Sequence, residues 1–284
     1  MTSRWRIPVA ALALALGCLT AAVGPADASQ SAHGAAAQPT VGTIHPRGVP
    51  AGFNPGGATN SVPGALAKRA GTVRNAIATR NWSGYVSTGA NGSYTGVSAQ
   101  WRQSGLNCTD PNSVQYVSFW VGLDGFNGSS VEQTGTLGIC DGTTPLYYAW
   151  YEMYPAPPVY YNVTVGPGNI MYGAVIYDGN DNYTLNLSLV NGNPFSESVT
   201  VNQPGLARSS AEVITEAPSI STGIAPLASF SPAWYRTAFA NGAQFNVLNP
   251  TPLVIADAAG NLQDTTSSMN TGNSGFINTW ISSS

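Results

Sequence analysis

The last part of the sequence, from Asn81 onward, contains no histidine and no lysine, and its only cysteines are Cys108 and Cys140. A Ser-His-Asp triad, a Cys-His pair, a Ser-Lys dyad and a histidine-based zinc site are therefore excluded from this region. An enzyme built from it must take its general acid and base from Asp, Glu or Tyr, helped by amides and backbone dipoles. This leaves glycosidase-like or acid-protease-like chemistry, or binding without catalysis. We expect no metal ion and no cofactor.

Charge is scarce as well, since charged residues make up 8% of the chain. From Asn81 onward only three residues are basic, against twelve Asp and Glu: Arg102, Arg208 and Arg236. Residues 29–80 show the reverse, because they hold no carboxylate but several cations: Arg47, Lys68, Arg69, Arg74 and Arg80. A basic leader before an acidic domain predicts a propeptide that docks electrostatically on its own enzyme. The alternative is a disordered linker or a wall-associated tail.

Long apolar runs are few, and one of them opens the chain. A basic start, the run "VAALALALGCLTAAV" and an Ala26-x-Ala28 cleavage site predict a signal peptide over residues 1–28, and hence secretion. Cys18 after "LALG" is also readable as a lipoprotein attachment site, although Ala15 stands where that motif has leucine. No other segment is long and apolar enough to cross a bilayer. In an exported protein, Cys108 and Cys140 are most simply a disulfide.

Ten short runs of strand-forming residues follow Asn81, separated by turn sequences such as "GANG", "CDGTTP" and "DGNDN". They cover residues 81–88, 93–103, 114–123, 145–155, 170–178, 182–190, 197–203, 209–217, 234–241 and 274–281. In "YTLNLSLV" the leucines alternate with polar residues, as a half-buried antiparallel strand requires. No helix of ten or more residues is predicted. The expected fold over residues 81–284 is an all-β, two-sheet antiparallel sandwich of the concanavalin or glucanase kind.

Aromatic residues are dense on several of these strands, and most of them fill the space between two sheets in the simplest interpretation. Trp150, Glu152 and Tyr154 share one face by the period-two rule, which places a carboxylate in an aromatic row. A polar group in such a row is costly unless the row lines a wet groove.

Five segments resemble, in the same order, one family, the eqolisins or glutamic endopeptidases, which are secreted acid proteases built on a β-sandwich. The segments are "NWSGYV", "WVGLDG" followed by "EQTG", "YAWYEMYP", "SSAEVITEAPS" and "PLASFSP". The resemblance covers essentially the whole chain after Asn81. It implies an acid endopeptidase that acts on polypeptides as a monomer, with its own propeptide as a partner and with no nucleic acid or membrane involved.

Carried over residue by residue, the family's catalytic pair falls on Gln133 and Glu216. Since neighbours on a strand point to opposite faces, the Gln133 amide is expected to face the cleft and Glu132 to face away. Glu212 shares the facing of Glu216 by the same rule, and we expect it to have a structural or surface role. The resemblance also implies a set of residues that line or support the cleft: Trp82, Trp120, Asp124, Glu152 and Tyr154.

Two departures from the family pattern bear on substrate contacts. Ala217 and Pro218 stand where fungal members carry an acidic and an aromatic residue, and Thr136-Leu137 replaces the aspartate after Gln-Thr-Gly. The rival interpretation is a polysaccharide-binding or glycosidic sandwich with Glu152 paired to Glu216 or Asp124. It gives no role to the Gln-Thr-Gly sequence or to the basic leader.

Overall fold

The computed structural model describes residues 43–50, 52–58, 73–126 and 128–283. The predicted signal peptide and much of the leader lie outside these residues. The strands are β1 (Thr43–Ile44), β2 (Ile77–Thr79), β3 (Trp82–Thr88), β4 (Gly96–Arg102), β5 (Val114–Leu123), β6 (Val131–Asp141), β7 (Thr144–Tyr154), β8 (Val159–Tyr161), β9 (Ile170–Tyr177), β10 (Asn182–Leu189), β11 (Phe195–Asn202), β12 (Ser210–Glu216), β13 (Ser219–Ile220), β14 (Gly223–Ile224), β15 (Ala233–Ala240), β16 (Ala243–Gln244), β17 (Thr251–Ala256), β18 (Leu262–Thr266) and β19 (Phe276–Trp280).

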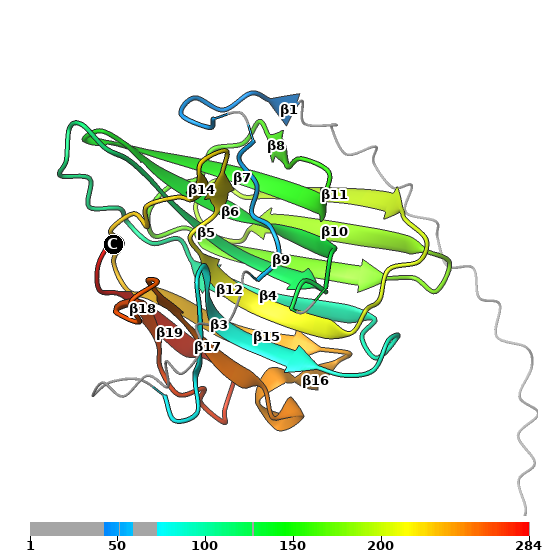
Figure 1. The fold of residues 1–284 in the computed structure, drawn as a ribbon. Helices are drawn as coiled ribbons and strands as arrows, with labels where there is room; N and C mark the ends of the chain where they lie inside the picture. The colour runs from blue at the N-terminus through cyan, green and yellow to red at the C-terminus, as the bar shows by residue number, and fades with distance from the viewer. Residues whose placement is uncertain (1–42, 51, 59–72, 127, 284) are drawn as a thin grey trace, which may run out of the picture. The chain divides into compact units, whose positions relative to one another are not determined.

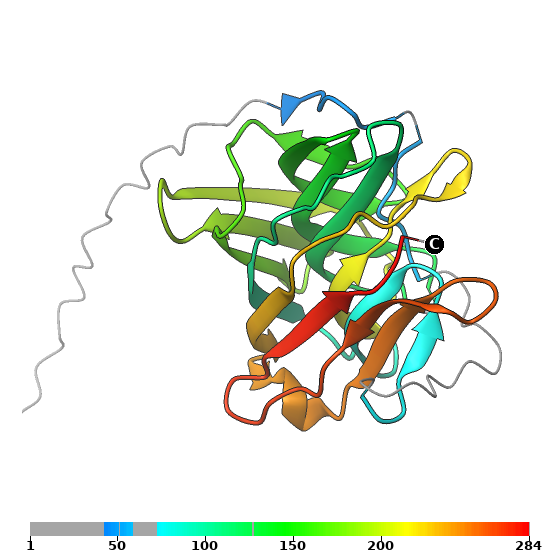
Figure 2. The same cartoon turned by 90° about the vertical axis from the view of Figure 1, so that its left-hand side faces the viewer.

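The strands form an all-β sandwich of two layers (Figure 1). One layer has the order β11-β10-β9-β4-β15, and the other has the order β17-β3-β12-β5-β6-β7-β8-β1. Strands β19 and β18 join the layers, because β19 pairs with β15 and β18 pairs with β17. Figure 2 shows β17, β18 and β19, in orange and red, beside the cyan β3.

Alternation along the strands explains the core between the layers. Leu185, Leu187 and Leu189 are buried on β10, whereas the residues between them are half-buried. On β5, Val117, Phe119 and Val121 belong to the same apolar cluster. The residues between these three on β5 point to the other face, and that face holds the candidate site.

All ten predicted runs are strands in the structure, and the predicted disulfide between Cys108 and Cys140 is confirmed. Strands β17 and β18 had not been predicted. The segment "PLASFSP" (226–232), one of the five that resemble the family and similar there to a late strand, is not a strand in this structure: Leu227 and Phe230 make only isolated bridges. Prolines at both ends of this segment lack the N–H that a ladder needs.

Within the described residues the single helix is a 3₁₀ turn at Phe245–Leu248, and no helix is long and apolar enough to span a membrane.

Candidate active site

Glu216 lies at the end of β12, between Trp82 on β3 and Ser118 on β5. Its side chain is fully buried. The Trp120 Nε1 donates a hydrogen bond to Oε2 at 2.8 Å, and the Asn81 Nδ2 donates one to Oε1 at 3.2 Å. Burial raises the pKa of Glu216 well above its ordinary value, while the N–H donors of Trp120, Trp82 and Asn81 act in the opposite direction. The carboxyl group is therefore held in one position by fixed donors.

Gln133 lies on β6, opposite Gly122 of β5 and Glu152 of β7. Its Nε2 donates to Glu152 Oε2 at 2.5 Å and also to the backbone carbonyl of Pro55. Burial raises the pKa of Glu152 well above its ordinary value, and the nearby Glu216 charge adds to this effect. The two contacts of Nε2 use both N–H groups of the amide and fix its orientation.

The indole of Trp120 connects the two halves of the site. It donates to Glu216 at one end, and at the other its ring lies against Gly122, the residue paired with Gln133. A Cβ placed on Gly122 would stand 2.9 Å from the Trp120 ring and 3.1 Å from the Gln133 Cβ. A Cβ on Gly135 would stand 2.3 Å from the Phe119 carbonyl oxygen. The glycine of Gln-Thr-Gly is therefore required by the close approach of the β5 backbone at Phe119 and Trp120.

The leader runs through this site. Three successive leader carbonyls, those of Pro55, Gly56 and Gly57, accept hydrogen bonds from three side chains of the sandwich. The donors are, in the same order, Gln133 Nε2, Trp82 Nε1 at 3.2 Å and Asn81 Nδ2 at 3.3 Å. Because Asn81 also donates to Glu216, the site binds a peptide backbone beside both members of the expected pair.

Backbone pairing holds the leader on each side of this stretch. Asn54 and Ser219 exchange two backbone hydrogen bonds of 2.9 Å, and the Ala58 N–H donates to the Gly125 carbonyl at 3.3 Å. The ring of Phe53 is buried and lies 5.7 Å from that of Tyr116. Figure 1 shows this part of the leader in blue, running from β1 across the sandwich.

Ion pairs contribute less to the binding of the leader on the sandwich than the charges in the sequence predict. One ion pair joins the described leader residues to the sandwich, Arg47 to Asp141 at 3.2 Å, and its side chains are 77% and 30% exposed. Exposed ion pairs of this kind stabilise a structure weakly. Hydrogen bonds to backbone carbonyls and the burial of Phe53 therefore account for most of the described contact.

Not all of the residues that the resemblance assigned to the cleft lie beside Gln133 and Glu216. Tyr154 faces the leader, since a Cβ on Gly56 would stand 3.3 Å from its ring. Asp124 instead turns to the start of β12, where its carboxylate accepts from the backbone N–H groups of Arg208 at 2.6 Å and Ser209 at 2.7 Å. It therefore supports a strand of the site and has no described contact with Gln133 or Glu216.

Glu132 and Glu212 are both fully buried, away from Gln133 and Glu216. Burial raises the pKa of Glu132 to about 9, and the charge of Asp124 contributes. Burial also raises the pKa of Glu212, as do the charges of Asp124 and Glu132. A surface role for Glu212 is excluded by its burial. Within the described residues, no group of three or more His, Cys, Asp and Glu is arranged to hold a metal ion.

Asn81 is a site residue that the sequence did not single out. It directly precedes Trp82 in "NWSGYV", so the motif itself carried the signal. The leader stretch "FNPGGA" was missed for a different reason. Its side chains are mostly small or absent, and it contacts the site through backbone carbonyls. Every residue type has a backbone carbonyl, so such contacts cannot be predicted from the residue types.

The site is thus a buried carboxyl group and a carboxamide on one face of a two-layer β-sandwich, with a peptide backbone across them, and this arrangement suits a peptidase that uses neither histidine nor thiol. A profile of the Peptidase A4 family matches residues 80–280, and the chain belongs to this family, the glutamic peptidases or eqolisins. The protein is therefore a glutamic peptidase, a hydrolase.

Solved structures show the same fold. A crystal structure of scytalido-glutamic peptidase with a transition state analog inhibitor is 22% identical, covers 71% of this chain and 98% of its own, and has a TM-score of 0.59. SCP-B, described as a member of the eqolisin family in complex with the tripeptide Ala-Ile-His, is 21% identical with the same coverages and a TM-score of 0.55. Aspergilloglutamic peptidase from Aspergillus niger is 20% identical, covers 59% of this chain and 99% of its own, and has a TM-score of 0.51. A search among curated proteins gives no match.

Proposed function

We propose that the protein is a secreted acid endopeptidase whose catalytic pair is Glu216 and Gln133. The observation that carries this proposal is the hydrogen bond from Gln133 Nε2 to the Pro55 carbonyl. A peptide carbonyl is thereby bound by the amide that would stabilise an oxyanion, next to a carboxyl group held by Trp120 and Asn81. This arrangement supports amide hydrolysis more directly than glycoside hydrolysis.

The reaction needs one base, one acid and one oxyanion donor. Ionised Glu216 takes a proton from a water molecule as the water oxygen bonds to the substrate carbonyl carbon. The Gln133 N–H that bonds the Pro55 carbonyl in this structure would hold the negative charge that develops on the substrate carbonyl oxygen, and it would do so at any pH because an amide does not titrate in this range. Glu216 then returns its proton to the leaving nitrogen as the C–N bond breaks. Atoms and charges balance without a cofactor.

The same proposal gives the leader a role as a propeptide. In the leader-bound form Glu216 is fully buried, and this burial raises its pKa and so disfavours the carboxylate form that acts as a base. Departure of Phe53–Ala58 admits water to the cleft, lowers the pKa of Glu216 by restoring solvation and frees Gln133. Acid protonates carboxylates of the acidic domain and weakens its attraction for the basic leader, so we expect the leader to leave at low pH.

Proteolysis of a denatured protein at about pH 3–4, compared between the wild type and the Glu216→Gln variant, tests the dyad. Turnover in the wild type and its near loss in the variant are expected. Processing of the leader in acid is followed on the same samples by gel. If the variant processes its leader as fast as the wild type, another protease removes the leader. If the variant also digests the substrate at the wild-type rate, the dyad is wrong.

A further inference from the structure

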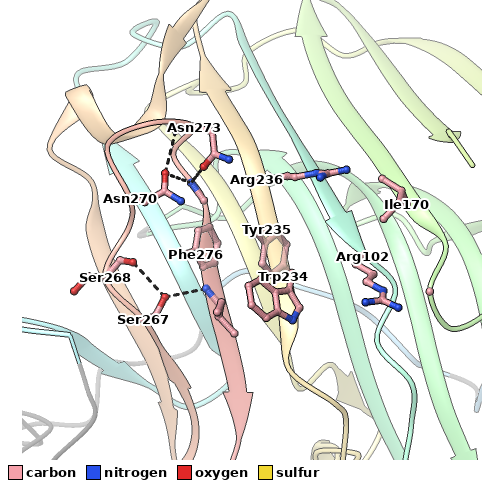
Figure 3. A pocket seen from close by; sticks show the side chains of 13 residues that line it. Arg102, Ile170, Trp234, Tyr235, Arg236, Ser267, Ser268, Asn270, Asn273 and Phe276 are labelled. Atoms are coloured by element: carbon pink, nitrogen blue, oxygen red, sulfur yellow. Dashed lines mark hydrogen bonds between the residues drawn. The ribbon is translucent and has the colours of Figure 1, made fainter.

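An exposed tryptophan stands between two cavities on the layer opposite the catalytic cleft. Trp234 on β15 is 54% exposed. A cavity of about 720 Å³ and a cavity of about 350 Å³ both reach this side chain, and the two share Trp234, Arg102 and Gly168 as lining residues. Figure 3 shows the larger cavity, with Trp234 and Arg102 near each other and Arg236 above them. We call the joined cavities the Trp234 groove.

Arginine side chains line the groove, although the domain after Asn81 has few basic residues. Arg102 and Arg236 both line it, and they are two of the three arginines after Asn81. No Asp or Glu is among its lining residues, and neither arginine forms an ion pair within the described part of the chain. The third arginine, Arg208, is engaged elsewhere, because its guanidinium lies 3.8 Å from the centre of the Tyr177 ring. A local positive site in an otherwise acidic domain favours an anionic ligand.

Strand register fixes these side chains on one face. Trp234 pairs with Arg102, and Arg236 pairs with Gln100, so all four point outward from neighbouring strands. The Gln100 Oε1 accepts a hydrogen bond of 3.2 Å from Arg236 Nε, which orients that guanidinium. The terminal nitrogens of Arg236 have no partner among the described residues, and Arg236 lines the larger cavity. A planar guanidinium presents paired donors that match a carboxylate.

The ligand must be recognised by side chains and not by strand pairing. Strand β15 is paired on one side with β4 and on the other with β19, so it has no free edge to which a peptide backbone could add. Ser268, Asn270 and Asn273 line the rim of the larger cavity opposite the tryptophan, and they supply hydroxyl and amide groups suited to the hydroxyls of a sugar. An exposed indole offers a flat apolar surface on which the C–H face of a sugar ring can stack.

We propose that the Trp234 groove binds an acidic polysaccharide, a polymer of uronic acid residues. Trp234 would stack on one sugar ring, and Arg102 and Arg236 would bind the carboxylates of its neighbours. A third cavity of about 380 Å³ is lined by residues of β4, β9 and β15, among them Ser98, Tyr172 and Phe239, and it extends the face for a long polymer. This site is independent of the peptidase reaction, and it would hold the enzyme on an anionic glycan while the other layer cleaves protein.

The test measures binding to polygalacturonate at pH 5, where uronate carboxyls are ionised. The full chain is used with the Glu216→Gln substitution, so that no self-processing occurs. We expect Trp234→Ala, and the double change Arg102→Gln with Arg236→Gln, each to weaken binding at least about tenfold and Trp234→Phe to keep most of it. Arg74→Gln, which removes an exposed cation elsewhere, is the matched control and should change binding less than about twofold. In the wild-type protein, these groove substitutions should leave peptidase activity unchanged.

Neutral dextran and poly-glutamate complete the experiment. The proposal requires that dextran bind weakly and that raised salt weaken the binding of polygalacturonate. Absence of polygalacturonate binding overturns the proposal. So does binding by the Trp234→Ala protein and by the Arg102→Gln/Arg236→Gln protein that is as tight as binding by the protein with an unaltered groove. Poly-glutamate binding as tight as that of polygalacturonate also overturns it, because the groove would then take an anionic polypeptide. All variants are checked by thermal unfolding, and since the altered side chains are exposed we expect unchanged melting temperatures.

Discussion

The Nε2 of Gln133 donates a hydrogen bond to the backbone carbonyl of Pro55, 78 residues earlier in the chain. The same nitrogen donates to Glu152, so the amide is clamped between a carboxyl of the sandwich and a peptide group of the leader. The protein's own chain thus occupies the place that the proposed mechanism assigns to a substrate.

Substitution of either member of the pair should abolish most peptidase activity while leaving the fold intact. Loss of one oxyanion donor typically costs about 10²–10³ in rate, and we expect at least this loss for Gln133→Glu and for Glu216→Gln. The measurement is kcat/KM at acid pH, with circular dichroism as the check on folding. Glu197→Gln makes the same carboxyl-to-amide change on β11 of the other layer and should retain full activity. Activity within threefold of wild type in either site variant would disprove the pairing.

Truncation of the Phe53 side chain should loosen the leader. The ring is buried against Tyr116, and removal of a buried phenylalanine side chain typically costs about 3–5 kcal/mol in a core. We expect Phe53→Ala to speed acid activation at least about tenfold and to give measurable activity at a less acid pH. His45→Ala, an exposed change in the same leader, should activate at the wild-type rate. Equal rates for the two variants would show that the Phe53 contact does not hold the leader in the cleft.

The hydrogen bond from Trp120 to Glu216 should set the acid limb of the pH profile. This donor favours the carboxylate form and lowers the pKa of Glu216, so its loss in Trp120→Phe raises that pKa. Hydrogen bonds to charged groups contribute about 1.5–3 kcal/mol, which corresponds to roughly one to two pH units. The acid limb of kcat/KM in activated enzyme should therefore move to higher pH.

Trp101→Phe is the matched control for this shift. Its Nε1 donates to the Thr136 hydroxyl at 3.1 Å in the core between the layers, and it does not contact Glu216. We expect its acid limb to coincide with that of the wild type. A shift of similar size in both variants would mean that packing, and not the donor to Glu216, governs the profile.

Stability should fall as the pH rises, and Glu132 should contribute to this fall. Its pKa is about 9 in the folded protein against 4.5 for the unperturbed group, so the folded state binds this proton more tightly than the unfolded state does. The resulting stabilisation is complete below about pH 4.5 and is lost as the pH rises toward 9, by up to about 1.4 kcal/mol per pH unit for one group. Asp124, Glu212 and Arg208 lie near enough to modify it.

Glu132→Gln should flatten the dependence of the free energy of unfolding on pH between 5 and 8, measured by urea titration. The amide has a similar shape and does not titrate, so the variant should lose less stability at pH 8 than the wild type. Asp110→Asn, an exposed change, should leave the slope as it is. A slope in Glu132→Gln equal to that of the wild type would assign the effect to other buried carboxyls, such as Asp264, whose pKa burial raises to about 7.

Local pattern was sufficient for most of the strands. The alternation of apolar and polar residues in β10 and the turn sequences between the strands are properties of neighbouring residues. They could therefore be recognised from the sequence without knowledge of the fold. β17 has a nearly continuous apolar sequence, "TPLVIA", which lacks alternation because it is buried on both faces, and it escaped prediction. The segment 226–232 resembled a strand, but only its long-range contacts show that it forms isolated bridges.

The sequence by itself determined the chemistry, because a domain without histidine, lysine or free thiol leaves only carboxyl, phenol and amide groups for catalysis. It also determined which face Gln133 takes relative to Glu132, since strand geometry alternates side chains. Only the tertiary structure decided what lies opposite them. The three carbonyls of Pro55–Gly57, the donor from Asn81, the direction of Asp124 and the grouping of Arg102 with Arg236 around Trp234 all depend on contacts between segments far apart in the chain. Backbone groups are the same in every residue, so a contact made through them leaves no mark in the sequence.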